Sequence, residues 1–123
     1  MISAHPLCNI FTLPLRPEVA HGGDGLVNAV RIARAGDVAG ACDFIDYAEV
    51  PPETSIGDHR HGPHEEEFYL ILAGTGLLRL EDDDFQVAAG HLVRNPPGGL
   101  HALRNTGAGP LKLFVFQLAV DAA

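Results

Sequence analysis

Residues 59–73 read HRHGPHEEEFYLILA, a stretch that bears on the fold and on the function at once. His59 and His61 stand two positions apart, so both side chains project from one face if residues 56–61 are extended, with Cα atoms about 6.6 Å apart. Neutral imidazole nitrogens bind divalent transition metals at about 2.0–2.1 Å. One ion can therefore bridge the two histidines, and one or two further ligands must then come from a facing strand.

Residues 67–73 (EFYLILA) are predicted to form the next strand, and both of its faces are apolar apart from Glu67. Gly62 and Pro63 allow the chain to turn back, so that this strand runs beside the first and Glu67 can supply a ligand. Segment 110–120 is apolar on both faces in the same way. Such strands face an interior on one side and a second sheet, the N-terminal arm or another subunit on the other. We therefore expect a homodimer.

The rest of the chain is also predicted to form strands. Short runs of β-branched, aromatic and leucine residues recur between Gly, Pro and Asp residues, and no 12-residue stretch has a strong apolar stripe at helical spacing. This pattern indicates an all-β fold, either a sandwich or a barrel. The expected strands are 26–34, 41–50, 67–73, 76–81, 84–89, 91–95, 100–105 and 110–120. Segment 26–34 also fits a helix face, and residues 1–25 are predicted to be an extended arm that is flexible at GGDG (22–25).

Length and charge limit the possible partners. A chain of 123 residues has the size of one domain. Sixteen acidic side chains against eight basic ones give a net charge of −8, which repels phosphate backbones, so we expect no nucleic-acid partner. No 20-residue window is free of charge, and no basic cluster precedes a continuous apolar run. We therefore expect no membrane partner and, by default, a cytoplasmic location.

A third imidazole is available downstream, in GHLVRNPPGGLHALRN (90–105). There Gly90 is followed after five residues by Pro96, after one by Gly98, after two by His101 and after three by Asn105. This spacing resembles the second conserved motif of the cupin superfamily. The segment from SIGDHRH (55–61) to EEFYLILAGTG (66–76) resembles the first motif. Together the two motifs cover about half the chain, positions 51 to 105.

The resemblance implies a single cupin domain over residues 1–123, with a double-stranded β-helix (jelly-roll) barrel over residues 41–120. It also implies a metal site made by His59, His61, Glu67 and His101. Two departures from the family pattern concern Glu53, which stands where the family usually has glycine, and the gap from His61 to Glu67, which is one residue longer than usual. Glu66 would restore the usual gap. We favour Glu67 because six residues separate it from Gly74, as in the family, and because a hairpin turn fixes strand register more firmly than a loop.

The remaining candidates are expected to have structural roles. His64 is interpreted as a solvated loop residue and His91 as a residue of the rim or outer face, while His5 and His21 in the arm receive no role. EDDD (81–84) is interpreted as a solvated hairpin turn, because it lacks the alternating oxygen donors and turn glycine of a calcium loop. Pro96-Pro97-Gly98-Gly99 is predicted to be a rigid turn that delivers His101.

Three neutral imidazoles and one carboxylate would leave an octahedral divalent ion with two open positions, where a small molecule with vicinal oxygens can chelate. Iron or manganese is favoured, and nickel, zinc, cobalt and copper also suit these ligands. The expected cavity is mostly apolar, and no Arg or Lys is assigned to its inner face, although Arg79 and Arg104 are left open; this disfavours phosphorylated sugars. Its expected lining comprises Tyr69, Ile71, Leu103, Leu113 and Val115, with Gln117 as a further polar group.

We therefore hypothesise a metal-dependent enzyme that acts on a small organic substrate. Dioxygenase-like chemistry is favoured over isomerase, lyase or cyclase chemistry, and no catalytic residue is assigned beyond the metal ligands. No serine or cysteine nucleophile is paired with a histidine, which disfavours covalent hydrolysis. The alternative hypothesis is a non-catalytic cupin that binds a small molecule.

Overall fold

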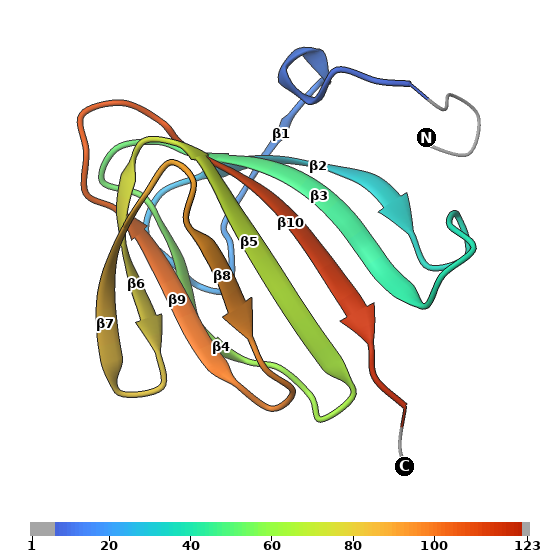
Figure 1. Ribbon diagram of the computed structural model, residues 1–123. Coiled ribbons are helices and arrows are strands. Elements are labelled where there is room, and N and C mark those ends of the chain that lie inside the picture. Colours follow the sequence, from blue (N-terminus) through green and yellow to red (C-terminus); the bar gives the residue numbers. More distant parts are fainter. Residues whose placement is uncertain (1–6, 122–123) are drawn as a thin grey trace.

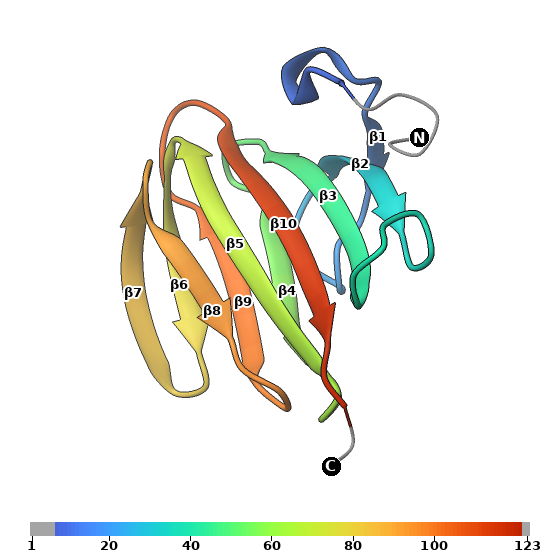
Figure 2. The same cartoon turned by 45° about the vertical axis from the view of Figure 1, so that its right-hand side comes forward.

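The computed structural model describes residues 7–121 and consists of two antiparallel sheets that face each other (Figures 1 and 2). The larger sheet has the order β1-β2-β3-β10-β5-β8, and the smaller sheet the order β4-β9-β6-β7. The larger sheet contains β1 (Arg16–Glu18), β2 (Val27–Arg34), β3 (Cys42–Val50), β5 (Glu65–Ala73), β8 (Leu92–Asn95) and β10 (Leu111–Ala119). The smaller sheet contains β4 (Ser55–Arg60), β6 (Thr75–Leu80), β7 (Asp83–Ala88) and β9 (Leu100–Asn105). The all-β prediction and the jelly-roll architecture are confirmed.

The core lies between the inner faces of the two sheets. In β10 the alternate residues Leu111, Leu113 and Val115 are at most 6% exposed, and they face Leu78 and Leu103 of the smaller sheet within one buried cluster. The alternation seen in the sequence therefore corresponds to every second residue of the strand being buried. The ambiguous segment 26–34 is a strand, β2, and not a helix.

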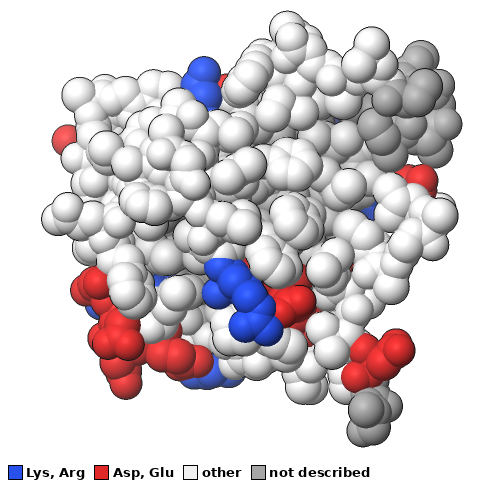
Figure 3. Space-filling model, in the orientation of Figure 1, with Lys and Arg blue, Asp and Glu red and all other residues white. Residues whose placement is uncertain are grey.

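The outer face of the larger sheet is apolar as well. Phe68 and Phe116 stack there with ring centroids 4.9 Å apart, and Phe114 lies beside them. Figure 3, in which this face is turned to the viewer, shows a broad area with few charged side chains. The homodimer expected from these two-sided strands stays a prediction.

The N-terminal arm contains more structure than the sequence indicated. A short 3-10 helix, η1 (Ile10–Thr12), places Phe11 edge-on against Tyr47 at a centroid distance of 5.7 Å, and β1 pairs with the edge of β2. No helix within residues 7–121 is long and apolar enough to cross a membrane.

Candidate metal centre

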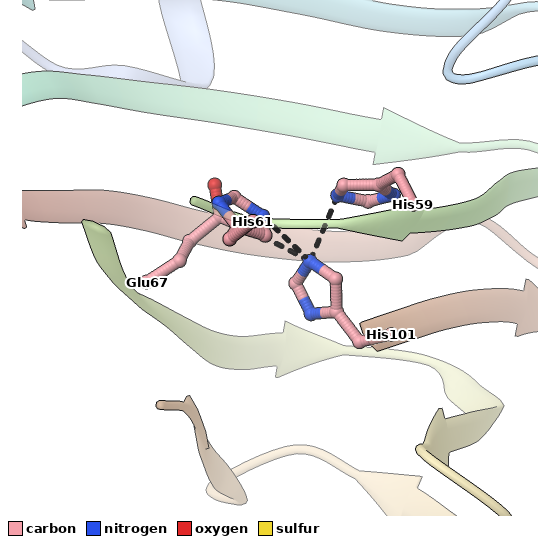
Figure 4. Close-up of side chains that lie close together, drawn as sticks. All are labelled: His59, His61, Glu67 and His101. Carbon is pink, nitrogen blue, oxygen red and sulfur yellow. Dashed lines mark hydrogen bonds and ion pairs between the residues drawn. The ribbon is translucent and has the colours of Figure 1, made fainter. Parts of the chain in front are cut away.

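Three histidines and one glutamate from three strands converge at one end of the barrel (Figure 4). His59 on β4 is paired with His101 on β9, His61 follows the end of β4, and Glu67 reaches across from β5 in the opposite sheet. One ligand atom from each of the four lies within 4.8 Å of the others. The structure thus brings together the four residues that the sequence proposed as metal ligands.

The contacts between the rings cannot all be hydrogen bonds. Nε2 of His101 lies 2.8 Å from Nε2 of His59 and 3.1 Å from Nε2 of His61. Nδ1 of His59 donates to the carbonyl of Gly57 at 2.8 Å, and Nδ1 of His61 donates to Glu65 at 3.0 Å, so neither neutral ring has a proton on Nε2. His101 can supply one proton to one contact at most. At least two lone pairs therefore face each other, an arrangement that a shared cation would stabilise.

The distances also fit a metal ion. Oε1 of Glu67 lies 3.0 Å from Nε2 of His101 and 3.2 Å from Nε2 of His61, yet this buried oxygen has no hydrogen-bond partner among the described residues. Separations of 2.8–3.2 Å join four pairs of these atoms, and all four atoms lie within 4.8 Å of one another, so the four residues would be able to hold one ion.

The three consecutive glutamates have three different partners. Glu65 accepts from Nδ1 of His61 and so fixes the tautomer of that ring, as carboxylates do behind metal-binding histidines. Glu66 points to the outer face, where it pairs with Arg94. Glu67 points inward and is 6% exposed. The strand register is therefore the one favoured from the sequence, and Glu66 lies outside the cluster.

The protonation states of Glu67 and His59 suit the binding of a cation. Burial raises the pKa of Glu67, but the nearby His101, followed by His61 and His59, lowers it by more, so the carboxyl is ionised at neutral pH. Burial lowers the pKa of His59 to about 4, although its hydrogen bond to Gly57 opposes this. His59 is therefore neutral at pH 7, with its Nε2 lone pair free to bind a metal.

Turns on either side hold the ligands in place. Gly98, with φ of 75°, donates its N–H to the carbonyl of Gly62 at 3.0 Å, and the N–H of His61 donates to the carbonyl of Gly99 at 3.0 Å. These bonds tie the turn before β9 to the segment that carries His61, as expected for a rigid turn that delivers His101. Glu53 has φ of 62°, a left-handed conformation that favours glycine, so the backbone keeps the shape of the family pattern although the residue differs.

His21 belongs to the site, although the sequence analysis gave it no role. Its ring stacks on that of His59 with centroids 3.6 Å apart and planes 9° from parallel. Gly23 and Gly57 make this possible, since a Cβ on Gly57 would lie 2.2 Å from the carbonyl oxygen of His21 and one on Gly23 would lie 2.2 Å from that of Ser55. The N–H of Gly57 also donates to Ala20 at 3.0 Å. The GGDG stretch, for which the sequence predicted flexibility, lies against β4 through Gly23.

We expect His21 to hold the His59 ring in its binding orientation. His21→Ala should speed the release of bound metal to a chelator by about 10-fold or more, the scale found for groups that orient ligands. His21→Phe keeps a flat ring for stacking and should release metal at nearly the wild-type rate. Stopped-flow transfer of Co²⁺ to a coloured chelator measures both, with His64→Ala as the control because His64 is exposed in the neighbouring loop. Equal rates in His21→Ala and wild type would contradict this role.

Two expectations about the cavity were wrong. Ile71, Leu103 and Leu113 are at most 1% exposed, so their side chains are part of the packed core below the cluster. The sequence analysis assigned no arginine or lysine to the inner face, but Arg31 of β2 lies there. Arg31 is opposite Asp46, and Asp46 is opposite Val115, whose side chain points inward; residues opposite each other share a face. Arg79 and Arg104, which were left open, lie on the outer face of the smaller sheet.

Other sequence interpretations of single residues are confirmed. His64 is exposed, and His91 is an exposed rim residue whose Nδ1 accepts from the N–H of Ala88 at 2.8 Å. Of the exposed EDDD segment, Glu81 and Asp82 form the turn between β6 and β7, and Asp83 and Asp84 begin β7.

Comparison with known proteins agrees with this architecture. The chain is 40% identical over 66 residues to an uncharacterized protein of Methanocaldococcus jannaschii, an alignment that spans 54% of the chain and about half (52%) of that relative. It is 29% identical over 94 residues to an oxalate-binding protein of Thermotoga maritima, covering 76% of the chain and 77% of that protein. A solved structure described as a predicted oxalate decarboxylase from Thermotoga maritima superposes with a TM-score of 0.87 at 23% identity, covering 93% of the chain and 99% of that structure.

The family model for the cupin domain matches residues 46–117, more than half of the chain and all four residues of the cluster. The two motifs, the two-sheet barrel and the three histidines with one glutamate all fall within this match or next to it. The protein therefore belongs to the cupin family.

Proposed function

We propose that the protein is a metalloenzyme that binds one divalent transition metal through His59, His61, Glu67 and His101 and acts on a small organic molecule with vicinal oxygens. The observation that carries this proposal is the convergence of three Nε2 atoms and one carboxylate oxygen with too few protons to bond one another. When bound, such an ion supplies Lewis acidity or, for iron and manganese, redox chemistry.

Tyr69 is the polar group best placed beside the cluster. Its hydroxyl lies 3.5 Å from Nε2 of His101, at the limit of a hydrogen bond. Burial raises the pKa of Tyr69 well above its usual range, and the charge of Glu67 adds to this, so the hydroxyl keeps its proton. Tyr69 can therefore donate a hydrogen bond to a ligand oxygen, and the apolar Val115 is its partner on β10.

Among the reactions open to such a centre we favour dioxygenase-like chemistry over isomerase, lyase or cyclase chemistry, with iron or manganese as the ion. A protonated Tyr69 would act there as a hydrogen-bond donor and not as a base.

The second candidate is a non-catalytic cupin that binds a small molecule. It is favoured by one observation, the similarity to a protein of Thermotoga maritima that carries the name oxalate-binding protein. In this version the same four residues hold the ion, and the ion holds the ligand.

The test starts from protein purified without a nickel-affinity tag. We expect about one equivalent of transition metal by elemental analysis, and a chelated sample should regain about 2.7 kcal/mol of unfolding free energy at a free metal concentration 100 times its Kd. That gain corresponds to a rise in Tm of roughly 10 °C for a domain of this size.

Oxygen uptake then separates the two candidates. Protein reloaded with iron or manganese should consume oxygen with at least one member of a panel of enols, diols and 2-hydroxy acids. Ligand binding by calorimetry without oxygen uptake or turnover would favour the binding protein. Failure to bind any of the six candidate metals would contradict both.

A further inference from the structure

Most positive charges of this acidic chain are neutralised by a neighbouring carboxylate. Arg31, Arg60, Arg79, Arg94 and Arg104 each have a carboxylate oxygen within 4.0 Å. Within residues 7–121, the cations with no such partner are Arg16, Arg34 and Lys112. Arg16 and Arg34 line the same cavity of about 510 Å³, together with Arg31. Its full lining is Pro14, Arg16, Glu18, Ala29, Val30, Arg31, Arg34 and Asp46.

The three arginines stand on the inner face of the larger sheet. Residues directly opposite each other in antiparallel strands project to the same face, so each arginine starts a row that can be followed across the sheet. Two of these rows end at residues of the metal cluster or beside it. The rows are Arg16–Ala29–Ala48–Leu113, Arg31–Asp46–Val115–Tyr69 and Arg34–Phe44–Gln117–Glu67.

Arg31 is held in a fixed orientation. Its Nε and Nη2 donate to Asp46 at 2.9 and 3.0 Å, and its guanidinium lies 4.2 Å from the centre of the Phe44 ring. Nη1 has no hydrogen-bond partner among the described residues. A guanidinium held on one edge by a carboxylate and on its flat side by a ring presents its remaining donors without further loss of side-chain entropy.

The charge of the cavity is opposite to that of the whole protein. Three arginines face Glu18 and Asp46, so the lining is net positive in a chain whose net charge is −8. Arginine forks match the geometry of carboxylate and phosphate groups. A cavity of this kind attracts anions from solution although the protein as a whole repels them.

The cavity lies on the same face of the larger sheet as the metal cluster. Phe44 and Glu67 lie two strands apart, about 10 Å between Cα atoms at the usual strand spacing. The guanidinium of Arg31 lies 4.2 Å from the centre of the Phe44 ring. A ligand that bridges the two places would have one end at the cluster and the other beside Arg31.

We propose that Arg16, Arg31 and Arg34 form an anion-binding subsite, so that the ligand of the metal centre is a small acid whose far end carries a carboxylate or a phosphate group. This inference rests on the proposed function, because the near end of the ligand is held by the metal. It replaces the earlier expectation of a mostly apolar cavity that disfavours phosphorylated compounds.

The test uses three compounds that share one chelating end, a 2-hydroxy acid, and differ at the other. Malate ends in a carboxylate, 3-phosphoglycerate in a phosphate and 2-hydroxybutyrate in a methyl group. With protein loaded with Co²⁺, calorimetry should show that malate or 3-phosphoglycerate binds at least tenfold more tightly than 2-hydroxybutyrate. The preference between the two charged compounds identifies the anionic group that the subsite takes.

The variants Arg16→Gln and Arg34→Gln, combined in one protein, should reduce this difference by at least about threefold, with Arg31 accounting for what remains, and should leave the affinity for 2-hydroxybutyrate unchanged. Neither side chain has an acidic partner, so the double variant leaves no carboxylate without its cation. A change of Arg31 would leave Asp46 without its ion-pair partner. Lys112→Gln is the matched control, because Lys112 is also unpaired but lies on the outer face beside Phe11. Equal affinity of the wild type for the three compounds, no binding of any, or an undiminished difference in the double variant overturns the subsite.

Metal content is measured first in every sample, which separates the two proposals. If the protein binds Co²⁺ normally but binds the three compounds with equal affinity, the subsite is contradicted and the proposed metal centre is not. Protein that takes up no metal contradicts the proposed function, and the subsite with it.

Discussion

His101→Ala should lower the affinity for the metal by at least about 100-fold, since even changes to groups that only orient a ligand cost 10- to 100-fold. His101 is central to the cluster, because its Nε2 lies 2.8–3.1 Å from the ligand atoms of His59, His61 and Glu67. The ring is 1% exposed and stands on the second residue of β9. Titration of the chelated protein with Co²⁺ or Mn²⁺ measures the loss.

The fold of this variant should survive. In the metal-free protein the ring of His101 contributes a facing lone pair and a buried Nδ1 that has no partner among the described residues. Removing the ring eliminates unsatisfied polar atoms, which raises the stability of the fold, and eliminates packing contacts, which lowers it. We expect the Tm of metal-free His101→Ala to stay within a few degrees of the metal-free wild type. His64→Ala, which removes an exposed histidine from the adjacent loop, should keep full metal affinity. Stoichiometric metal with wild-type affinity in His101→Ala would remove the basis of the proposed centre.

Local spacing predicted part of the fold and of the cluster. Alternation with a period of two located β5 and β10, and the separation of His59 and His61 by one residue placed both on one side of the chain. The assignment of His101, and the choice of Glu67 from its spacing to Gly74, came from the resemblance to the cupin motifs.

The inner position of the arginines could not be predicted, because it depends on a β-bulge. Strict alternation would place Arg31 and Arg34 on opposite faces, since they are three residues apart. The register of β2 against β3 shifts between Arg31 and Ala33, which returns Arg34 to the same face as Arg31. No residue in VNAVRIAR predicts this β-bulge.

The contributions of β1 and His21 were missed for a different reason. Arg16–Glu18 is exposed throughout and includes a proline, so it has no strand pattern of its own and pairs only because β2 offers a free edge. His21 reaches His59 through the contact between Gly23 and Gly57, two residues 34 positions apart. The signal that was available is the GGDG stretch itself, since glycines also occur where two backbones must approach closely.

Glu67→Gln and Glu66→Gln should have opposite consequences, although they change neighbouring residues in the same way. Gln at 67 removes the negative charge at the centre of the cluster, so the metal affinity should fall by about 10- to 100-fold. The amide can also donate to Nε2 of His61 or His101, which pairs a lone pair that the carboxylate cannot. The metal-free Tm should therefore rise or stay the same, while the stabilisation by metal largely disappears.

Gln at 66 affects only the pair with Arg94 on the outer face, whose arginine side chain is 56% exposed. A pair of this kind contributes about 0–1 kcal/mol, so stability should change little and the metal affinity should not change. Scanning calorimetry of both variants, with and without Co²⁺, gives the two effects in one set of experiments. A larger loss of metal-dependent stabilisation in Glu66→Gln than in Glu67→Gln is incompatible with the inward position of Glu67. Because the two residues occupy opposite faces of β5, only a shift of the whole strand by one residue could produce that result, and the shift would also expose Tyr69, Ile71 and the rest of the buried row.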